Sequence, residues 1–539
     1  MNNESVTNSL HETGSGGRMR TVAALQPGFG FISVGGVVGV AVVLLGAFSS
    51  QAMVALAFFA ALLIAAILIK ISPRIVFLGL VLGYFFGGNI FGKLGLANAG
   101  MPLYMGEIGI GLGVTLLLVT NILEHREWRA AFGPMRPVLL PFGIFVIMGV
   151  VSVIFGAFGV VRAEIAALPI SLLVSAIPWI GDIYSGFYSA KVGMRHFAFV
   201  YYALMFFVPA MIIRSWGEFR TTIYIVVGAL LAVIPVRQLG LIEHLAHYYH
   251  PIGMIACMVL VYRERSSWAR VVLFVLILWA AYLTAIDDVR SNFLALGVVG
   301  FVIAMHALRF NWRHIRVNFS RRSLLIYLSV LAIVGILGRL LIPSTSFREL
   351  TSIFNQVDKF KILYSGDMAD FRGGNEGWRT AMWADMLKTA FRAPLTGIGL
   401  GTPFYPASFM QKGWIWADFN DPSLTMFVYP HNSVLFVLLR MGLPATVALV
   451  VMLVRCWRMA FGLQFVARWR FAADAAYFLG AATLFMFFAS LTSVMLELPQ
   501  AAIPFWFLLG MIPVAVRFAD GGRLCTYDAP VDAAQAAMA

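Results

Sequence analysis

Long apolar runs recur along almost the whole chain, and they decide what it can fold into. A helix needs about 20 mostly apolar residues to cross the hydrocarbon layer of a bilayer. Windows of this kind predict fourteen spans, near residues 31–48, 52–71, 74–90, 106–124, 137–156, 195–213, 220–236, 247–262, 269–286, 290–308, 323–342, 434–456, 475–495 and 501–517. With 60% hydrophobic and only 12% charged residues, the chain has more apolar surface than one soluble core could bury. The sequence therefore predicts an all-α polytopic membrane protein.

The basic residues support this order of spans independently of hydropathy. Cytoplasmic loops of membrane proteins are enriched in Lys and Arg. With the N-terminus in the cytoplasm, 23 of the 39 Lys and Arg residues fall in the short segments assigned to the inside, and the alternation holds for every loop. We therefore interpret the net charge of +14 as a signal of membrane topology and expect no nucleic-acid partner.

The spans and polar segments divide the chain into five predicted parts. Residues 1–28 form a cytoplasmic tail, 29–342 a membrane domain with about eleven spans, 343–430 a long external loop, 431–518 a membrane segment with about three spans, and 519–539 a second cytoplasmic tail. Long ordered loops are commonly functional. We therefore expect binding or catalysis at the loop 343–430 and at the membrane surface beside it.

An amphipathic helix and a glycine-rich turn are predicted inside this loop. Apolar residues at 378, 382, 383, 386 and 387 recur at helical spacing within Glu376–Leu387, and Pro394 ends the helix. The run Gly397–Gly401 follows. A nucleotide-binding glycine motif needs a strand before it and a helix after it. Because the order here is reversed, we interpret the run as a tight turn packed against the membrane domain.

A histidine stands where the loop meets the next span, in the sequence Pro430-His431-Asn432-Ser433. A neutral imidazole is available as a base near pH 7. The positive end of a helix dipole favours that neutral form. His431 is therefore a candidate general base. The alternative is a structural role, in which His431 caps the helix or forms a hydrogen bond at the surface with Asn432 or Ser433 as the actual cap.

Several of these motifs together resemble the O-antigen ligase and polymerase superfamily. The resemblance rests on Trp378-Arg379 with Trp383, on Pro394–Gly401, on Pro430–Ser433, on Gly442-Leu443, and on Asp288–Asn292 at the start of an earlier span. These motifs share one predicted side of the membrane and cover about a third of the chain, from roughly 290 to 457. The N-terminal half contributes only a compatible topology.

The resemblance implies a GT-C-like helical glycosyltransferase of the bacterial inner membrane. Members of the family move a glycan from undecaprenyl diphosphate to an acceptor hydroxyl on the periplasmic face, by an inverting reaction without a metal ion or cofactor. The acceptor is a growing exopolysaccharide or O-antigen in a polymerase, and the lipid A-core in a ligase. Fourteen spans and a long N-terminal half favour the polymerase. A chain-length regulator is a further partner that the resemblance implies.

The same chemistry suggests roles for charged residues on the predicted outer side. Because the guanidinium fork of arginine pairs with phosphate oxygens, Arg290 and Arg237 are candidate diphosphate ligands. Arg195 is the alternative to Arg237, and Arg290 has the alternative of a surface ion pair with Asp287 or Asp288. Asn432, Asp288, Arg379 and Trp383 are supporting candidates. His244, His247 and His250 recur at a spacing of three, but the sequence offers no clear carboxylate or cysteine partner beyond Glu243, so we expect no metal site.

A transporter or flippase of a lipid-linked glycan is the alternative from another functional class. Transporters commonly contain internal repeats and broken helices near the membrane midplane. We detect no repeat in this sequence, and the candidate residues gather at the predicted outer surface. The sequence therefore favours an enzyme.

Overall fold

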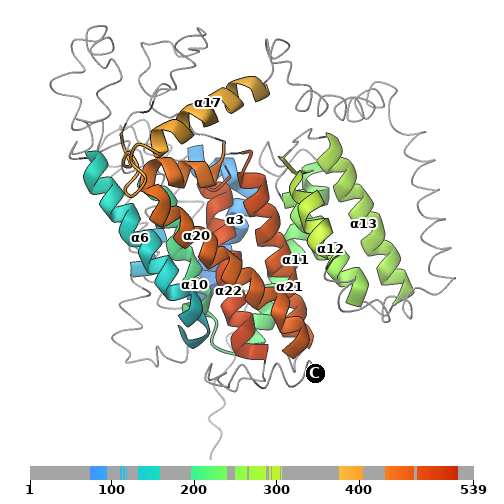
Figure 1. Cartoon of the computed structure of the whole chain (residues 1–539). Coiled ribbons are helices and arrows are strands. Elements are labelled where there is room, and N and C mark those ends of the chain that lie inside the picture. The colour runs from blue at the N-terminus through green and yellow to red at the C-terminus, as the bar shows by residue number, and fades with distance from the viewer. Residues whose placement is uncertain are drawn as a thin grey trace, which may run out of the picture. The chain divides into compact units, whose positions relative to one another are not determined.

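The computed structural model describes ten segments of the chain, and all statements below concern them. They are residues 73–93, 110–117, 132–157, 196–238, 249–263, 266–286, 291–305, 375–404, 431–466 and 470–519, without 112, 116, 293, 304, 403 and 494. Every regular element in these segments is a helix (Figure 1). The predicted spans 31–48, 52–71 and 323–342 lie outside the described residues.

Six described helices are long and apolar enough to cross a membrane. They are Gly133–Ile154, Trp216–Ile234, Ser267–Thr284, Ser433–Gln464, Arg470–Ser490 and Pro499–Ala519. Shorter apolar helices cover Pro73–Phe85, His196–Ile212, Tyr249–Val261 and Leu294–Ile303. Ten of the predicted spans therefore coincide with apolar helices, which supports an all-α, multi-pass membrane protein. The span predicted at 475–495 is wrong in its bounds, because the helix ends at Ser490.

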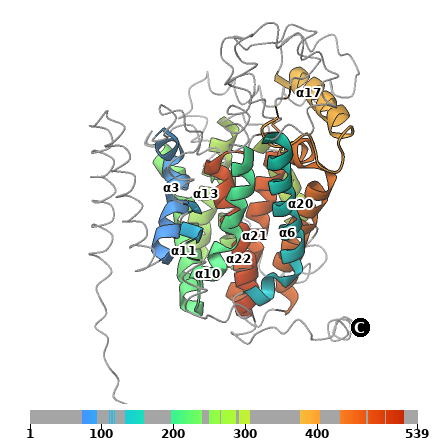
Figure 2. The same cartoon turned by 90° about the vertical axis from the view of Figure 1, so that its left-hand side faces the viewer.

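The helices are labelled as in Figure 1. Their bounds are α3 (Pro73–Lys93), α6 (Arg136–Ala157), α10 (Val208–Ile212), α11 (Trp216–Gln238), α12 (Tyr249–Arg263), α13 (Ser267–Ile286), α17 (Asn375–Ala390), α20 (Ser433–Val466), α21 (Arg470–Ser490) and α22 (Pro499–Ala519), with short 3-10 turns η2 (Gly133–Met135) and η4 (Ala203–Phe206). Helix α22 packs against α3, α10, α20 and α21 and is the most deeply buried of the long helices (Figure 2). Gly510 permits this packing, since a Cβ atom there would lie 2.1 Å from the carbonyl oxygen of Phe206.

Helix α20 also carries an exposed apolar stripe. Leu443, Val447, Val450 and Val454 are all at least 38% exposed and recur at a spacing of three or four residues. The opposite face of α20 packs against α6 and α21. An exposed stripe of this kind on an apolar helix is the surface that contacts lipid in a membrane.

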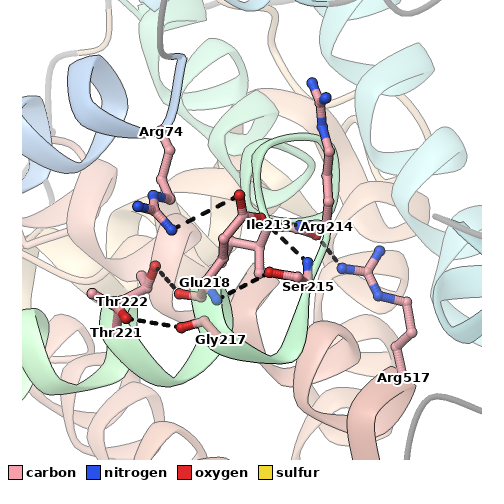
Figure 3. A network of polar contacts seen from close by, with 9 residues as sticks. All are labelled: Arg74, Ile213, Arg214, Ser215, Gly217, Glu218, Thr221, Thr222 and Arg517. Carbon is pink, nitrogen blue, oxygen red and sulfur yellow. Dashed lines mark hydrogen bonds and ion pairs between the residues drawn. The ribbon is translucent and has the colours of Figure 1, made fainter. Parts of the chain in front are cut away.

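Helix α11 begins with a capping box. The backbone N–H of Glu218 donates to Ser215 Oγ (3.2 Å), and the backbone N–H of Ser215 donates to Glu218 Oε2 (3.2 Å). Glu218 Oε2 also accepts a 2.7 Å hydrogen bond from the backbone N–H of Arg214 (Figure 3). This reciprocal arrangement satisfies backbone donors that the first turn of a helix leaves free. It fixes where the chain turns between α10 and α11.

Basic residues gather around this turn, which we call the basic end. Arg74 lies 3.9 Å from Glu218, and Arg517 donates to the backbone carbonyl of Ile213 (Figure 3). The charge pattern assigns Arg74, Arg214 and Arg517 to the same side of the membrane, and the structure brings them together. Helix α22 runs from Pro499 to Arg517 and beyond, about 27 Å at 1.5 Å per residue. Its first turn therefore lies at the opposite end of the helices.

Candidate functional site

The first half of α20 is set apart by a break at Gly442, whose φ of 81° and ψ of −179° are not helical. Glycine adopts this conformation without steric cost. An unbroken helix would pair the N–H of Leu443 with the carbonyl of Leu439. Instead, Leu443 donates to the carbonyl of Pro394 (2.6 Å), and Pro444 has no N–H to donate. The break therefore leaves the carbonyls of Leu439 and Arg440 available to another segment.

The glycine run occupies this break. The N–H of Ile398 donates to the carbonyl of Leu439 (2.8 Å), and the N–H of Gly399 donates to that of Arg440 (3.1 Å). The backbones approach so closely that a Cβ on Gly397 would lie 2.4 Å from the carbonyl carbon of Arg440. The prediction of a tight turn packed against the membrane helices is confirmed.

Further contacts hold the turn to two other helices. Ser152 of α6 donates through Oγ to the carbonyl of Arg440 (2.5 Å) and accepts from the N–H of Leu400 (2.9 Å). The N–H of Gly401 donates to Nδ1 of the buried His196 (3.2 Å). Since Nδ1 accepts this bond, it carries no proton. Three separate helices thus fix the glycine run.

Arg440 is a structural residue whose role sequence reasoning did not assign. Its side chain is 1% exposed, and Nη1 donates to the backbone carbonyls of Gly399 (3.5 Å) and Thr402. The carbonyl groups of the turn thus accept hydrogen bonds from a buried guanidinium group. These hydrogen bonds compensate for the removal of its positive charge from water. An arginine two residues before a glycine and four before a proline was the available signal in the sequence.

Helix α17 packs on the first half of α20 and confirms the predicted amphipathic helix. Met382 and Met386 pack with Leu435 and Leu439 of α20, and Trp383 lies against the same cluster. The prediction placed Leu387 on the apolar face, but its side chain is 40% exposed. The helix ends at Ala390, before Pro394.

Arg379 joins α17 to the connection between α21 and α22. Its Nη1 donates to the carbonyl of Thr492 (3.2 Å). Thr492 follows the end of α21, at the end of the helices opposite the basic end. Two predicted site residues, Arg379 and Trp383, thus lie on the helix that packs against the start of α20.

Asn432 caps α20. The sequence offered Asn432 and Ser433 as alternatives for this cap. Its Oδ1 accepts from the N–H of Leu435 (2.9 Å), and its carbonyl accepts from the N–H of Phe436 (2.9 Å). His431 is therefore not the helix cap. It adopts a φ of 51°, the only positive φ of a non-glycine residue in the described part of the chain. Such a conformation costs free energy, so the surroundings must hold it in place.

The environment of His431 keeps its imidazole neutral. Burial lowers the pKa of His431 to about 4, and the positive charge of Arg379 acts in the same direction as the second cause. Sequence reasoning expected a neutral imidazole but attributed it to the dipole of α20. In the structure the pKa of His431 is lowered, as expected, but by burial and by the charge of Arg379. Arg379 is one of the predicted site residues.

Replacing Arg379 with Gln should raise the pKa of His431, because it removes a positive charge that disfavours the imidazolium. The pKa should stay below the ordinary value, because burial is the larger cause. Diethyl pyrocarbonate modifies neutral imidazole, so the rate of modification of the His431 peptide against pH, followed by mass spectrometry, reports this pKa. Arg379→Lys keeps the charge and should keep the low pKa. An unchanged or lower pKa in Arg379→Gln would contradict this account.

Glu497, which lies just before α22, is a further residue of the site. Ser433 donates through Oγ to Glu497 Oε2 (2.8 Å). Burial raises the pKa of Glu497 to about 8, against the opposing effect of the Ser433 hydroxyl and of the backbone N–H groups of Glu497 and Leu496. Its carboxyl group is therefore mostly protonated at pH 7. Its place in the last predicted outer loop was the available signal.

The remaining predicted residues are described only in part. The backbone of Arg237 lies in the last turn of α11, away from the capping box at the basic end, but its side chain lies outside the described residues. Tyr249 at the start of α12 donates to the carbonyl of Gln500 in α22, so the start of α12 lies at the same end of the helices as Glu497. Arg290, Asp288 and Arg195 lie outside the described residues.

The three histidines at a spacing of three are described at one position only. His250 is buried at the start of α12, whereas His244 and His247 lie outside the described segments. No group of three or more His, Cys, Asp or Glu side chains in the described segments is placed to hold a metal ion.

Comparison with protein families bears directly on this arrangement. The family model for O-antigen ligase matches residues 275–450. This stretch of the chain is similar to the O-antigen ligase family, in agreement with the resemblance found in the sequence. It contains α17, the glycine run, His431 and the break in α20. No curated protein matches the chain. The O-antigen ligase domain indicates a multi-pass membrane enzyme that transfers glycans in polysaccharide assembly.

Proposed function

We propose that this protein transfers an oligosaccharide from undecaprenyl diphosphate to an acceptor hydroxyl and thereby extends a surface polysaccharide, an exopolysaccharide or an O-antigen. The observation that carries the proposal is the neutral, half-buried imidazole of His431, held at the start of α20 inside the O-antigen ligase domain. A neutral imidazole is the form that removes a proton from a hydroxyl group.

The proposed topology has fourteen spans in the bacterial inner membrane, with the site facing the periplasm. Residues 1–28 and 519–539 are cytoplasmic tails, 29–342 and 431–518 are membrane segments, and 343–430 is a periplasmic loop. The basic end supports this orientation, because Arg74, Arg214 and Arg517 lie at the end of the helices opposite Glu497. A cytoplasmic basic end puts His431 on the periplasmic side.

In the proposed reaction, His431 accepts the proton of the acceptor hydroxyl as its oxygen attacks the anomeric carbon of the donor. The bond between that carbon and the diphosphate oxygen breaks on the opposite face, its electron pair leaves with undecaprenyl diphosphate, and the configuration inverts. A pKa of about 4 makes the free imidazole fully available but weakly basic. The negative charge of a bound diphosphate would raise this pKa and strengthen the base during turnover.

Arginine side chains take the place of a metal ion in this proposal. Arg290 and Arg237 bind the diphosphate, and Arg379 contributes positive charge beside His431. Asn432 caps α20 next to the base, and Trp383 supports α17. In this proposal Asp287 or Asp288 pairs with Arg290 before the donor binds. Guanidinium groups stabilise the charge that develops on the leaving group, so neither a metal ion nor another cofactor is required.

Turnover with a chelator present tests the proposal. Purified protein in lipid receives an undecaprenyl-diphosphate oligosaccharide, and released undecaprenyl diphosphate and longer glycans are measured. A ladder of products is expected for a polymerase. No glycan transfer, with the lipid-linked glycan crossing the bilayer instead, would contradict the enzyme proposal and favour a transporter or flippase.

The second candidate function is an O-antigen ligase, because the matching family model bears that description. It would transfer the glycan once, to a lipid A-core acceptor, with the same residues. The same assay separates the two functions, since a single addition that requires the lipid A-core would identify the ligase. Adding a chain-length regulator should change the length of the ladder only for a polymerase.

A further inference from the structure

The connection between α21 and α22 contacts the start of α20 through a buried carboxyl group. Glu497 is 7% exposed, and its Oε2 accepts the 2.8 Å hydrogen bond from Ser433. Its Oε1 is buried and has no hydrogen-bond partner of good geometry among the described residues. Burying a carboxyl group costs free energy. Its placement against Ser433 therefore needs a reason.

The contact lies two residues from His431, at the point where α20 begins. The left-handed backbone of His431 persists only if its surroundings hold it. Asn432 holds it from within α20 through the cap. Ser433, the first helical residue, ties the same turn to Glu497 before α22.

The same connection also holds Arg379. In this connection, the carbonyl of Thr492 accepts a hydrogen bond from Arg379 Nη1 (3.2 Å). Glu497 accepts the hydrogen bond from Ser433. The connection thus contacts both the turn that carries the imidazole and the arginine that lowers its pKa. A displacement of this connection would change the distance between the two groups.

We infer that Glu497 is a positioning residue for the proposed transfer reaction. It holds Ser433, and through Ser433 it fixes the imidazole of His431 relative to Arg379. This inference rests on the proposed function. Displacing a catalytic group by about 1 Å can reduce the rate by about 100-fold. The effect of losing Glu497 should therefore fall on kcat more than on KM.

The neutral form of Glu497 performs this role. The groups around the connection are His431 just before α20, Ser433 at the start of α20, Arg379 on α17 and Gln500 on α22. Between pH 4.5, the ordinary pKa of this group, and about pH 8, the folded state binds a proton on Glu497 that the unfolded state has lost. The stabilisation from this proton is fully present below pH 4.5 and is lost as the pH rises through about 8.

Two substitutions at Glu497 test whether kcat depends on the contact with Ser433 or on the negative charge of the carboxylate. In Glu497→Ala, kcat at pH 7 should fall by about 10- to 100-fold with a smaller change in KM. Glu497→Gln keeps a neutral acceptor for Ser433, so it should recover kcat relative to the Ala variant. The wild-type kcat should fall as the pH rises through about 8, and Glu497→Gln should lack this alkaline fall. A Gln variant as defective as the Ala variant would overturn the inference.

Ser433→Ala supplies a second test that leaves Glu497 in place. It should lower kcat to a similar degree, and the double variant should be no worse than either single variant, because both remove the same contact. Additive losses would overturn the inference.

The rate at which diethyl pyrocarbonate modifies His431 gives a readout that needs no glycan transfer. This rate should increase in Glu497→Ala and return towards the wild-type value in Glu497→Gln. An unchanged rate in Glu497→Ala would contradict the positioning role, even where transfer is active. Absence of transfer in the wild type, with the modification rates as expected, would overturn the proposed function and leave the positioning role of Glu497 intact.

Discussion

Replacing His431 with Gly should lower kcat for glycan transfer by about 10²- to 10⁴-fold, the usual contribution of a positioned general base. Glycine is the informative substitution because His431 has a φ of 51°. Glycine adopts this conformation without steric cost, so the variant should fold at least as well as the wild type. The measurement is the release of undecaprenyl diphosphate by equal amounts of folded, membrane-inserted protein.

Two further variants make this experiment decisive. His431→Ala removes the same imidazole but keeps a Cβ in the left-handed conformation, so it should be equally inactive and somewhat less stable. His11→Ala, in the segment 1–28 far from the site in sequence, controls for the loss of a histidine as such. Near-normal release of undecaprenyl diphosphate by His431→Gly would show that His431 is not the base.

Local patterns in the sequence were enough to predict α17 and the glycine turn. Met382, Trp383 and Met386 recur at helical spacing because one face of α17 packs on α20, so the pattern reports burial directly. The glycine run lacks the order of elements that binds nucleotides, and its close approach to Arg440 explains why Gly397 is required. Both features depend mainly on residues close together in the chain.

The contacts between distant segments could not be predicted in this way. Ser433 and Glu497 are 64 residues apart, and no local pattern indicates that they share a hydrogen bond. The causes of the low pKa of His431 could not be predicted either, since burial and the charge of Arg379 both depend on packing between distant segments. Sequence reasoning obtained the direction from the helix dipole and missed both causes. Hydropathy averages over a window, which explains why the bounds of α21 were displaced.

Replacing Gly442 with Ala should strongly destabilise the protein, although it adds only one methyl group. The φ of 81° costs a non-glycine residue about 1–3 kcal/mol. The new Cβ would also lie 2.6 Å from the carbonyl carbon and oxygen of Leu395 and 2.8 Å from the nitrogen of Gly397. Backbone atoms on both sides cannot move aside without breaking the hydrogen bonds between the glycine run and α20. We expect a lower Tm and reduced transfer, because the first half of α20 carries His431.

Gly462→Ala is the matched control, because it adds the same methyl group to the same helix. Among the described residues, no atom outside the surrounding helix backbone lies within 4 Å of a Cβ at Gly462, and alanine is favoured over glycine in a helix by about 1 kcal/mol. Its Tm should equal or exceed that of the wild type. Gly397→Ala should resemble Gly442→Ala, and the double variant should lose less than the sum of the two, since both substitutions disrupt one contact. If Gly442→Ala were as stable as Gly462→Ala, the close packing of the glycine run against the break in α20 would not contribute to stability.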